Sequence, residues 1–226
     1  MSNDLTVIYY TSNLEDEEFE HRIQSRLLSV SGDIPIISVS LKPIVFGKNI
    51  CLGEHEPNDV MLHYQLLVGC MEAKTPFIIT AESDFLYPPE YFSFKPPKEE
   101  EIYYYRNIRL AYSSKWGFFK KKQSEGAKIA GREYLIGLLT EWLKDFPCGR
   151  PRSEWPRKFN PTIPHDWFGG RIACVTWKTG NGLRKTCGVE RERSIRELPY
   201  WGSVDSLREE LFGTNCGSDN GQLRCV

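Results

Sequence analysis

Two acidic residues, Glu82 and Asp84, are the side chains of this sequence whose types and spacing best suit metal binding. They close "FIITAESDF", an apolar, β-rich run that predicts a buried strand. Alternate residues of a strand share a face, so the two carboxylates would act together. At the carboxyl edge of a parallel sheet, such hard oxygen ligands suit Mg²⁺ or Mn²⁺ that carries a diphosphate. An acidic surface turn is the alternative explanation.

A second candidate site is the stretch "VTWKTGNGLRK", in which Gly180 and Gly182 are flanked by Lys178, Arg184 and Lys185. Backbone N–H groups and cations in such a loop bind anions, which predicts a lid over a diphosphate or a phosphate contact to an acceptor. A plain hairpin with exposed basic residues is the alternative. The sequence has neither a Walker spacing nor a G-x-G-x-x-G after its first predicted strand, which argues against a P-loop ATPase and a nicotinamide enzyme.

Charge is distributed unevenly, although the net charge of the 226 residues is −1. Residues 1–104 hold 7 Lys and Arg against 17 Asp and Glu, residues 105–200 hold 20 against 9, and residues 201–226 hold 2 against 4. The basic middle segment predicts a face that meets phosphates. Its run "KWGFFKKK" suits base stacking and DNA phosphate contacts by Lys120, Lys121 and Lys122. Solvated lysines are the simpler explanation.

The elements that would position these residues alternate between strand and helix. Apolar patterning predicts strands at 4–13, 33–41 and 75–85, helices at 14–30 and 58–73, and a loop at 42–53. This order builds an α/β fold in which helices flank a mainly parallel sheet.

The rest of the chain predicts fewer regular elements. The patterns indicate extended strands near 102–112, a basic loop at 115–128, a helix at 131–145, an irregular stretch at 147–170, a strand at 171–178 and a helix at 203–212 capped by Ser203. No internal repeat or low-complexity linker interrupts the sequence. We therefore expect one domain over 1–226, with a metal and nucleotide half (1–104) and a basic acceptor half (105–226).

Cysteines and apolar runs indicate the compartment. The seven cysteines are scattered without a C-x-x-C pair, which argues against a zinc knuckle and a disulfide framework, although Cys216 and Cys225 could pair if oxidised. No apolar run reaches the about 20 residues of a membrane helix, and the N-terminus lacks signal-peptide features. We expect a cytoplasmic protein.

The order of segments resembles a known family. "YYTSN", "ISVSLKPIVFGKNICLG", "HYQLLVGCMEAK" and "FIITAESDFLYPPEYF" together are similar to nucleotide-sugar glycosyltransferases of the GT-A fold, in the family 2-like group of bacteria and phages. The similarity spans residues 5–145 and implies a UDP-sugar donor with Mn²⁺ or Mg²⁺. Glu82-x-Asp84 replaces the family's Asp-x-Asp motif, so Asp84 is implied as the metal ligand and Glu82 as part of the donor site.

The resemblance implies further donor-site residues. Besides Lys178 and Arg184, they follow the first strand or lie in the loop and helix after the second, namely Thr11, Ser12, Asn13, Gly47, Lys48, Asn49 and Gln65. Ordinary turn polarity, a solvated lysine and a helix-surface glutamine explain these residues equally well.

The same resemblance implies an acceptor side. "AGREYLIGLL" places Glu133 at a helix start, where the helix dipole stabilises an anion, so Glu133 is a candidate general base. Asp166 is the rival base, and His165 beside it is a candidate second metal ligand. An ordinary helix-start glutamate and a structural histidine are the alternatives.

Taken with the basic segment, the resemblance to phage glycosyltransferases implies hydroxymethyl-pyrimidine in DNA as the acceptor, with the base flipped out of its stack. A bacterial glycan or a lipid-linked acceptor is the alternative within the same class. A non-catalytic nucleic-acid-binding protein and a nucleotidyltransferase are the competing classes. The sugar and the oligomeric state are not indicated.

Overall fold

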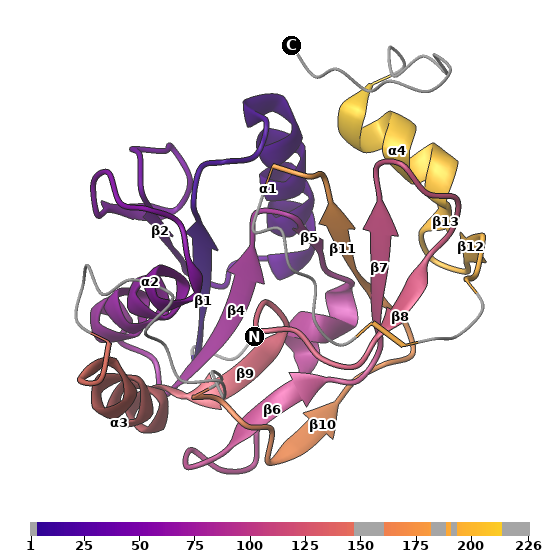
Figure 1. The fold of residues 1–226 in the computed structure, drawn as a ribbon. Coiled ribbons are helices and arrows are strands. Elements are labelled where there is room, and N and C mark those ends of the chain that lie inside the picture. Colours follow the sequence, from indigo (N-terminus) through magenta and orange to yellow (C-terminus); the bar gives the residue numbers. More distant parts are fainter. Residues whose placement is uncertain (1–3, 147–160, 182–188, 191–193, 214–226) are drawn as a thin grey trace.

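A computed structural model of the chain describes residues 4–146, 161–181, 189–190 and 194–213 (Figure 1). Its main sheet has seven strands in the order β10-β6-β9-β4-β1-β2-β3. These strands are β1 (Leu5–Thr11), β2 (Ile36–Ser40), β3 (Lys48–Cys51), β4 (Phe77–Glu82), β6 (Ile102–Tyr105), β9 (Lys128–Gly131) and β10 (Asp166–Phe168). Strands from both predicted halves of the chain therefore form one sheet.

Helices cover both faces of this sheet, and the predicted α/β class is confirmed. β1, β2, β3 and β4 are parallel, and the crossovers between them include α1 (Glu17–Ser31) and α2 (Asp59–Glu72). Asp16 and Asn58 cap these helices by accepting backbone N–H groups of the first turn. α2 lies beside α3 (Arg132–Leu143) on one face (Figure 1), and Leu27 of α1 packs against the other.

The structure adds four strands to segments that the sequence predicts as loops or irregular: β3, β8 (Phe119–Lys121), β9 and β10. β9 is antiparallel and lies between β4 and β6. All four are three or four residues long, so none contains a full period-two pattern. β3 also depends on Gly47, which has a φ of +58° and whose added Cβ would lie 2.5 Å from the carbonyl oxygen of Ile36.

A second, four-stranded sheet packs beside the first. Its order is β5 (Phe85–Leu86), β11 (Cys174–Lys178), β7 (Ile108–Tyr112) and β8. The Trp177 N–H donates to the Asp84 carbonyl at 2.7 Å, so the end of β11 lies beside the turn after β4. The short pair β12 (Glu197–Leu198) and β13 (Gly202–Ser203) leads into α4 (Val204–Phe212), which Ser203 caps as predicted.

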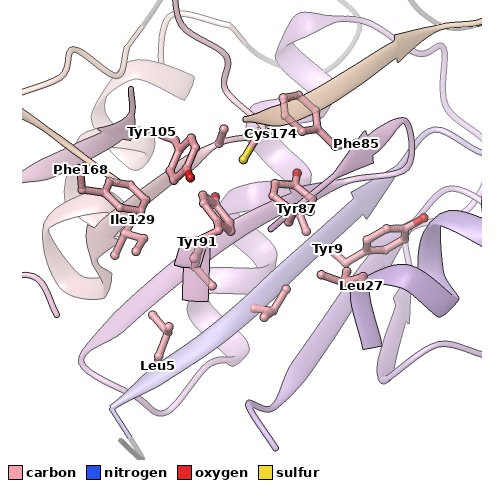
Figure 2. Packing of buried hydrophobic residues seen from close by; sticks show 14 of the residues in the cluster. Leu5, Tyr9, Leu27, Phe85, Tyr87, Tyr91, Tyr105, Ile129, Phe168 and Cys174 are labelled. Carbon is pink, nitrogen blue, oxygen red and sulfur yellow. The ribbon is translucent and has the colours of Figure 1, made fainter. Parts of the chain in front are cut away.

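Aromatic rings fill the space between the two sheets (Figure 2). Tyr91, in the 3-10 helix η1 (Pro89–Ser93), is fully buried and stacks on Tyr87 at 4.7 Å between centroids. Tyr105 and Phe168 pack on the other side of Tyr91. This core holds the turn after β4 rigidly, because Phe85 and Tyr87 belong to it. None of the helices in the described ranges is long and apolar enough to cross a membrane.

Candidate functional site

Glu82 lies at the carboxyl end of β4, as predicted, and is held there on two sides. Its Oε1 accepts from the hydroxyl of Tyr10 on β1 at 2.7 Å. Its backbone N–H donates to the hydroxyl of Tyr87 at 3.0 Å. The side chain is half-buried, facing the side of the sheet that carries α2. This carboxylate therefore has a fixed place at the edge of the sheet.

Asp84 follows in the turn between β4 and β5 and is also half-buried. The charges that act on its carboxylate come from three other segments: Glu15 before α1, Lys121 on β8 and Lys178 at the end of β11. The charges of Asp84 and Lys121 act on the carboxylate of Glu82. The edge thus gathers three carboxylates and two lysines, which we call the edge cluster (Glu15, Glu82, Asp84, Lys121 and Lys178).

The edge cluster disfavours its own negative charge. Burial raises the pKa of Glu82, and the charge of Asp84 raises it further. Burial also raises the pKa of Asp84, with Glu15 adding to the effect, and Lys121 and Lys178 offset only part of it. The pKa of Glu15 is raised by burial, although the Thr179 hydroxyl donates to it at 2.6 Å. A bound cation would relieve this repulsion.

The donor set suits a metal ion that substrate phosphates help to hold. Among the described residues, no three His, Cys, Asp or Glu side chains are placed to bind one ion. That excludes, for this part of the chain, a cage made by protein ligands alone. Mg²⁺ usually takes one or two carboxylates and fills its other positions with water and phosphate oxygens, which the Glu82 and Asp84 pair allows.

Three residues predicted for the metal and acceptor sites lie toward the opposite, amino edge. Arg132 donates its backbone N–H to Pro76 just before β4, and the exposed Glu133 next to it pairs with the Arg132 side chain. His165 Nδ1 accepts from the N–H of Ile102, which pairs through Ala130 with Ile78.

Ile78 lies about 13 Å from Glu82 along β4, at about 3.3 Å per residue. The exposed Asp166 pairs with Tyr103, one position further along β6. The structure therefore does not bring these residues together with Asp84: His165 lies too far away to share an ion with it, and Glu133 and Asp166 lie toward the other edge. The sequence shows that all three follow strands, but not that β9 runs antiparallel.

The loop predicted to bind the donor, which contains Gly47, Lys48 and Asn49, also lies away from the edge cluster. Lys48 pairs with Ile37 near the start of β2 and forms an ion pair with Glu72, so Gly47 and Lys48 lie at the amino edge. The Asn49 Nδ2 donates to the hydroxyls of Ser38 and Ser40. These bonds hold the β2–β3 connection together and account for Asn49 without a ligand.

The remaining predicted donor residues do lie at the carboxyl edge. Asn13 has a φ of +53°, and its Oδ1 accepts from the N–H groups of Leu41 and Lys42, which closes the edge between β1 and β2. Buried Gln65 donates to the carbonyls of Thr11 and Val39, and the Thr11 hydroxyl donates to Glu20. Half-buried Ser12 lies between Thr11 and Asn13. Gly182 and Arg184, and also Cys216 and Cys225, lie outside the described residues.

Lys121, the middle one of the three lysines predicted to bind DNA, lies apart from the other two. It donates to Ser124 at 2.9 Å and acts on the edge cluster, whereas Lys120 pairs with Glu190 at 3.0 Å and Lys122 is exposed. Neighbouring residues of a strand alternate between faces, which explains why Lys121 differs from Lys120.

Sequence reasoning did not single out Glu15 and Tyr10, and it considered Lys121 only as a DNA contact and not as a neighbour of Glu82 and Asp84. Glu15 and the end of β1 could have been placed from topology, because both follow a parallel strand at the edge where β4 ends. The position of Lys121 near the edge cluster could not have been predicted in this way, because it depends on how the second sheet packs.

Comparisons with known proteins give the fold only weak relatives. No protein-family model matches the sequence, and no curated protein matches it. The bifunctional IspDF from Campylobacter jejuni has a TM-score of 0.38 and 10% identity, over 65% of this chain and 44% of that one. A glycosyltransferase involved in the glycosylation of the major capsid of PBCV-1 has a TM-score of 0.38 and 13% identity, over 73% of this chain and 79% of that one. S. aureus TarS 1–349 has a TM-score of 0.38 and 12% identity, over 61% of this chain and 48% of that one.

This chain therefore spans less than half the length of two of these three structures. At such TM-scores the similarities establish neither a family nor an activity.

The raised pKa of Asp84 predicts a pH-dependent effect of Asp84→Asn on stability. Native Asp84 holds its proton to higher pH than the unfolded chain does, so wild type loses stability as pH rises through the native pKa. Asn does not titrate. We expect Asp84→Asn to raise the unfolding free energy by on the order of 1–3 kcal/mol at about pH 7.5, and by little at about pH 4. Urea titrations of both proteins measure the difference, and a constant difference across this range would refute the shift.

Lys121 and Lys122 offer a matched pair of substitutions. If Lys121 neutralises the edge cluster, Lys121→Ala should weaken the binding of a metal–nucleotide diphosphate by about tenfold or more, whereas Lys122→Ala should leave it nearly unchanged. Titration calorimetry with Mn²⁺ and UDP compares the two variants. Equal losses would show that the lysines act as a general basic patch.

Proposed function

We propose that this chain transfers a sugar from a nucleotide-sugar donor to a hydroxyl acceptor, with Mg²⁺ or Mn²⁺ bound by Glu82 and Asp84. The observation that carries the proposal is the edge cluster. Two half-buried carboxylates with raised pKa lie at the carboxyl edge of a mainly parallel sheet, where the charge of Lys121 acts on both of them and that of Lys178 acts on Asp84. Such an arrangement suits a cation and a diphosphate together, because the cation neutralises the carboxylates and the diphosphate neutralises the lysines and the cation.

The residues of the cluster then have distinct tasks. Asp84, in the turn, is positioned to bind the ion directly, and Glu82, fixed by Tyr10, supports it. Lys121 and Lys178 would contact phosphate oxygens and retain the diphosphate as it leaves. The metal supplies a Lewis acid that neutralises the charge of the leaving group.

Glu15 is our candidate to accept the proton of the acceptor hydroxyl. Its carboxylate acts on Asp84, and its raised pKa brings it nearer to the working range of a general base. It takes the role predicted for Glu133 or Asp166, which face the other edge. The acceptor is a hydroxyl compound, with a glycan and modified DNA as the two arms to test.

A thermal-shift screen of UDP-sugars with and without Mn²⁺ tests the proposal. A ligand that binds only the native state stabilises it and so raises the melting temperature. At a ligand concentration of a hundred times Kd, the free energy of unfolding increases by about 2.7 kcal/mol. We expect a rise that needs both the UDP-sugar and the metal. No rise with any combination would refute the donor site. The mass of the product then separates sugar transfer from transfer of the nucleotide.

A further inference from the structure

Gly126 packs directly against the side chain of Glu82. A Cβ added at residue 126 would lie 2.5 Å from Cδ and 2.6 Å from Oε2 of Glu82. The backbone of Gly126 is not left-handed, so its conformation does not demand glycine. What demands glycine is the space that the Glu82 carboxylate occupies.

The turn that contains Gly126 is tied to the end of β4 by the hydroxyl of Tyr87. That hydroxyl accepts from the backbone N–H of Glu82 at 3.0 Å and donates to the Gly126 carbonyl at 2.6 Å. The Thr80 hydroxyl donates to the Glu125 carbonyl at 3.0 Å. Lys121 donates to Ser124 at the start of the same turn, so the turn (Ser124–Gly126) joins two sides of the edge cluster.

A buried ion pair anchors this turn from beneath. The side chain of Lys128 is fully buried and pairs with the Glu125 carboxylate. The same carboxylate accepts from the hydroxyls of Tyr104 at 2.7 Å and Thr162 at 2.6 Å. Charge-assisted bonds of this kind fix geometry strongly, so the turn has little freedom to move away from Glu82.

We propose that the turn Ser124–Gly126 is a positioning element for Glu82, and that Gly126 acts by leaving room for the carboxylate between this turn and Tyr10. The proposal rests on the proposed function for its ligand, Mn²⁺ with UDP. It assigns Gly126 no contact with substrate. A larger residue at 126 would force the flexible Glu82 side chain outward, and the Tyr10 hydroxyl would lose its acceptor.

A double-mutant cycle tests this inference. Gly126→Ala should weaken Mn²⁺–UDP binding by about 10–100-fold, the range typical of residues that orient a metal ligand. In a Glu82→Ala background, where no carboxylate meets the added methyl, the same substitution should change binding by less than about twofold. Gly137→Ala on α3, with nothing within 4 Å of an added Cβ, is the matched control and should leave binding unchanged.

Two readouts keep this test separate from the proposed function. If wild type does not bind Mn²⁺ and UDP, the proposed function fails, and crystal structures of wild type and Gly126→Ala still decide the positioning role. We expect the Glu82 carboxylate to leave Tyr10 in the variant. An unmoved carboxylate, or equal losses of binding in both backgrounds of the cycle, would overturn the inference.

Discussion

Replacing Asp84 by Asn is expected to abolish metal-dependent binding of a nucleotide sugar while leaving the protein folded. The amide keeps the size of the side chain but removes the negative charge that a divalent cation requires. We expect at least about a 100-fold loss of affinity for Mn²⁺ with UDP, together with nearly complete loss of turnover. Calorimetry measures the first and product mass spectrometry the second.

The control for this prediction is Asp33→Asn, because Asp33 is exposed and precedes β2. It should match wild type in both assays. A fully active Asp84→Asn with unchanged dependence on metal would remove Asp84 from the metal site. Because the same variant should be more stable at neutral pH, loss of binding could not be attributed to unfolding.

Replacing Lys128 by Met is expected to be strongly destabilising. The Lys128 side chain is fully buried, and its removal leaves the Glu125 carboxylate without its cation. Breaking one partner of a buried pair costs about 3–5 kcal/mol. Urea unfolding near neutral pH measures the cost. Lys144→Met, which breaks an exposed pair with Glu141, should cost less than about 1 kcal/mol.

The double variant Glu125→Gln with Lys128→Met should recover much of this loss, because Gln carries no charge, its amide oxygen can still accept from Tyr104, and its NH₂ group can donate to the Thr162 hydroxyl. In wild type, Lys128 is among the groups that lower the pKa of Glu125 to about 2. The ionised Glu125 therefore makes its full contribution to the free energy of unfolding above the unfolded pKa of about 4.3, and this contribution disappears as the pH falls through about 2. A double variant no more stable than Lys128→Met would show that the charge pairing is not the source of the loss.

The sequence predicts the parallel part of the fold well because that part repeats one local rule. β1, α1, β2, α2 and β4 each have a clear apolar period or an N-cap such as Asp16. The same rule predicts Glu82 at the end of β4, whereas Asp84, expected on the same strand, lies in the turn that follows. β9 escapes this reasoning, because four residues cannot indicate that they insert antiparallel between β4 and β6.

That one insertion accounts for much of what the sequence could not predict in the site. It turns Glu133 toward the amino edge, since α3 starts where β9 ends. It also brings Glu125 and Gly126 beside Glu82. Lys121 faces the cluster only because a second sheet, paired through Trp177 and Asp84, folds back over the edge. Each of these placements depends on long-range pairing, which local sequence patterns do not encode.

The most direct measurement is the anomalous scattering of Mn²⁺ in crystals grown with Mn²⁺ and UDP. We expect one strong peak beside the carboxylate of Asp84, at a coordination distance of about 2.1 Å, with diphosphate oxygens completing the shell between Lys121 and Lys178. A Mn²⁺ peak that lies away from Glu82 and Asp84, or UDP bound without contact to the edge cluster, would contradict the account.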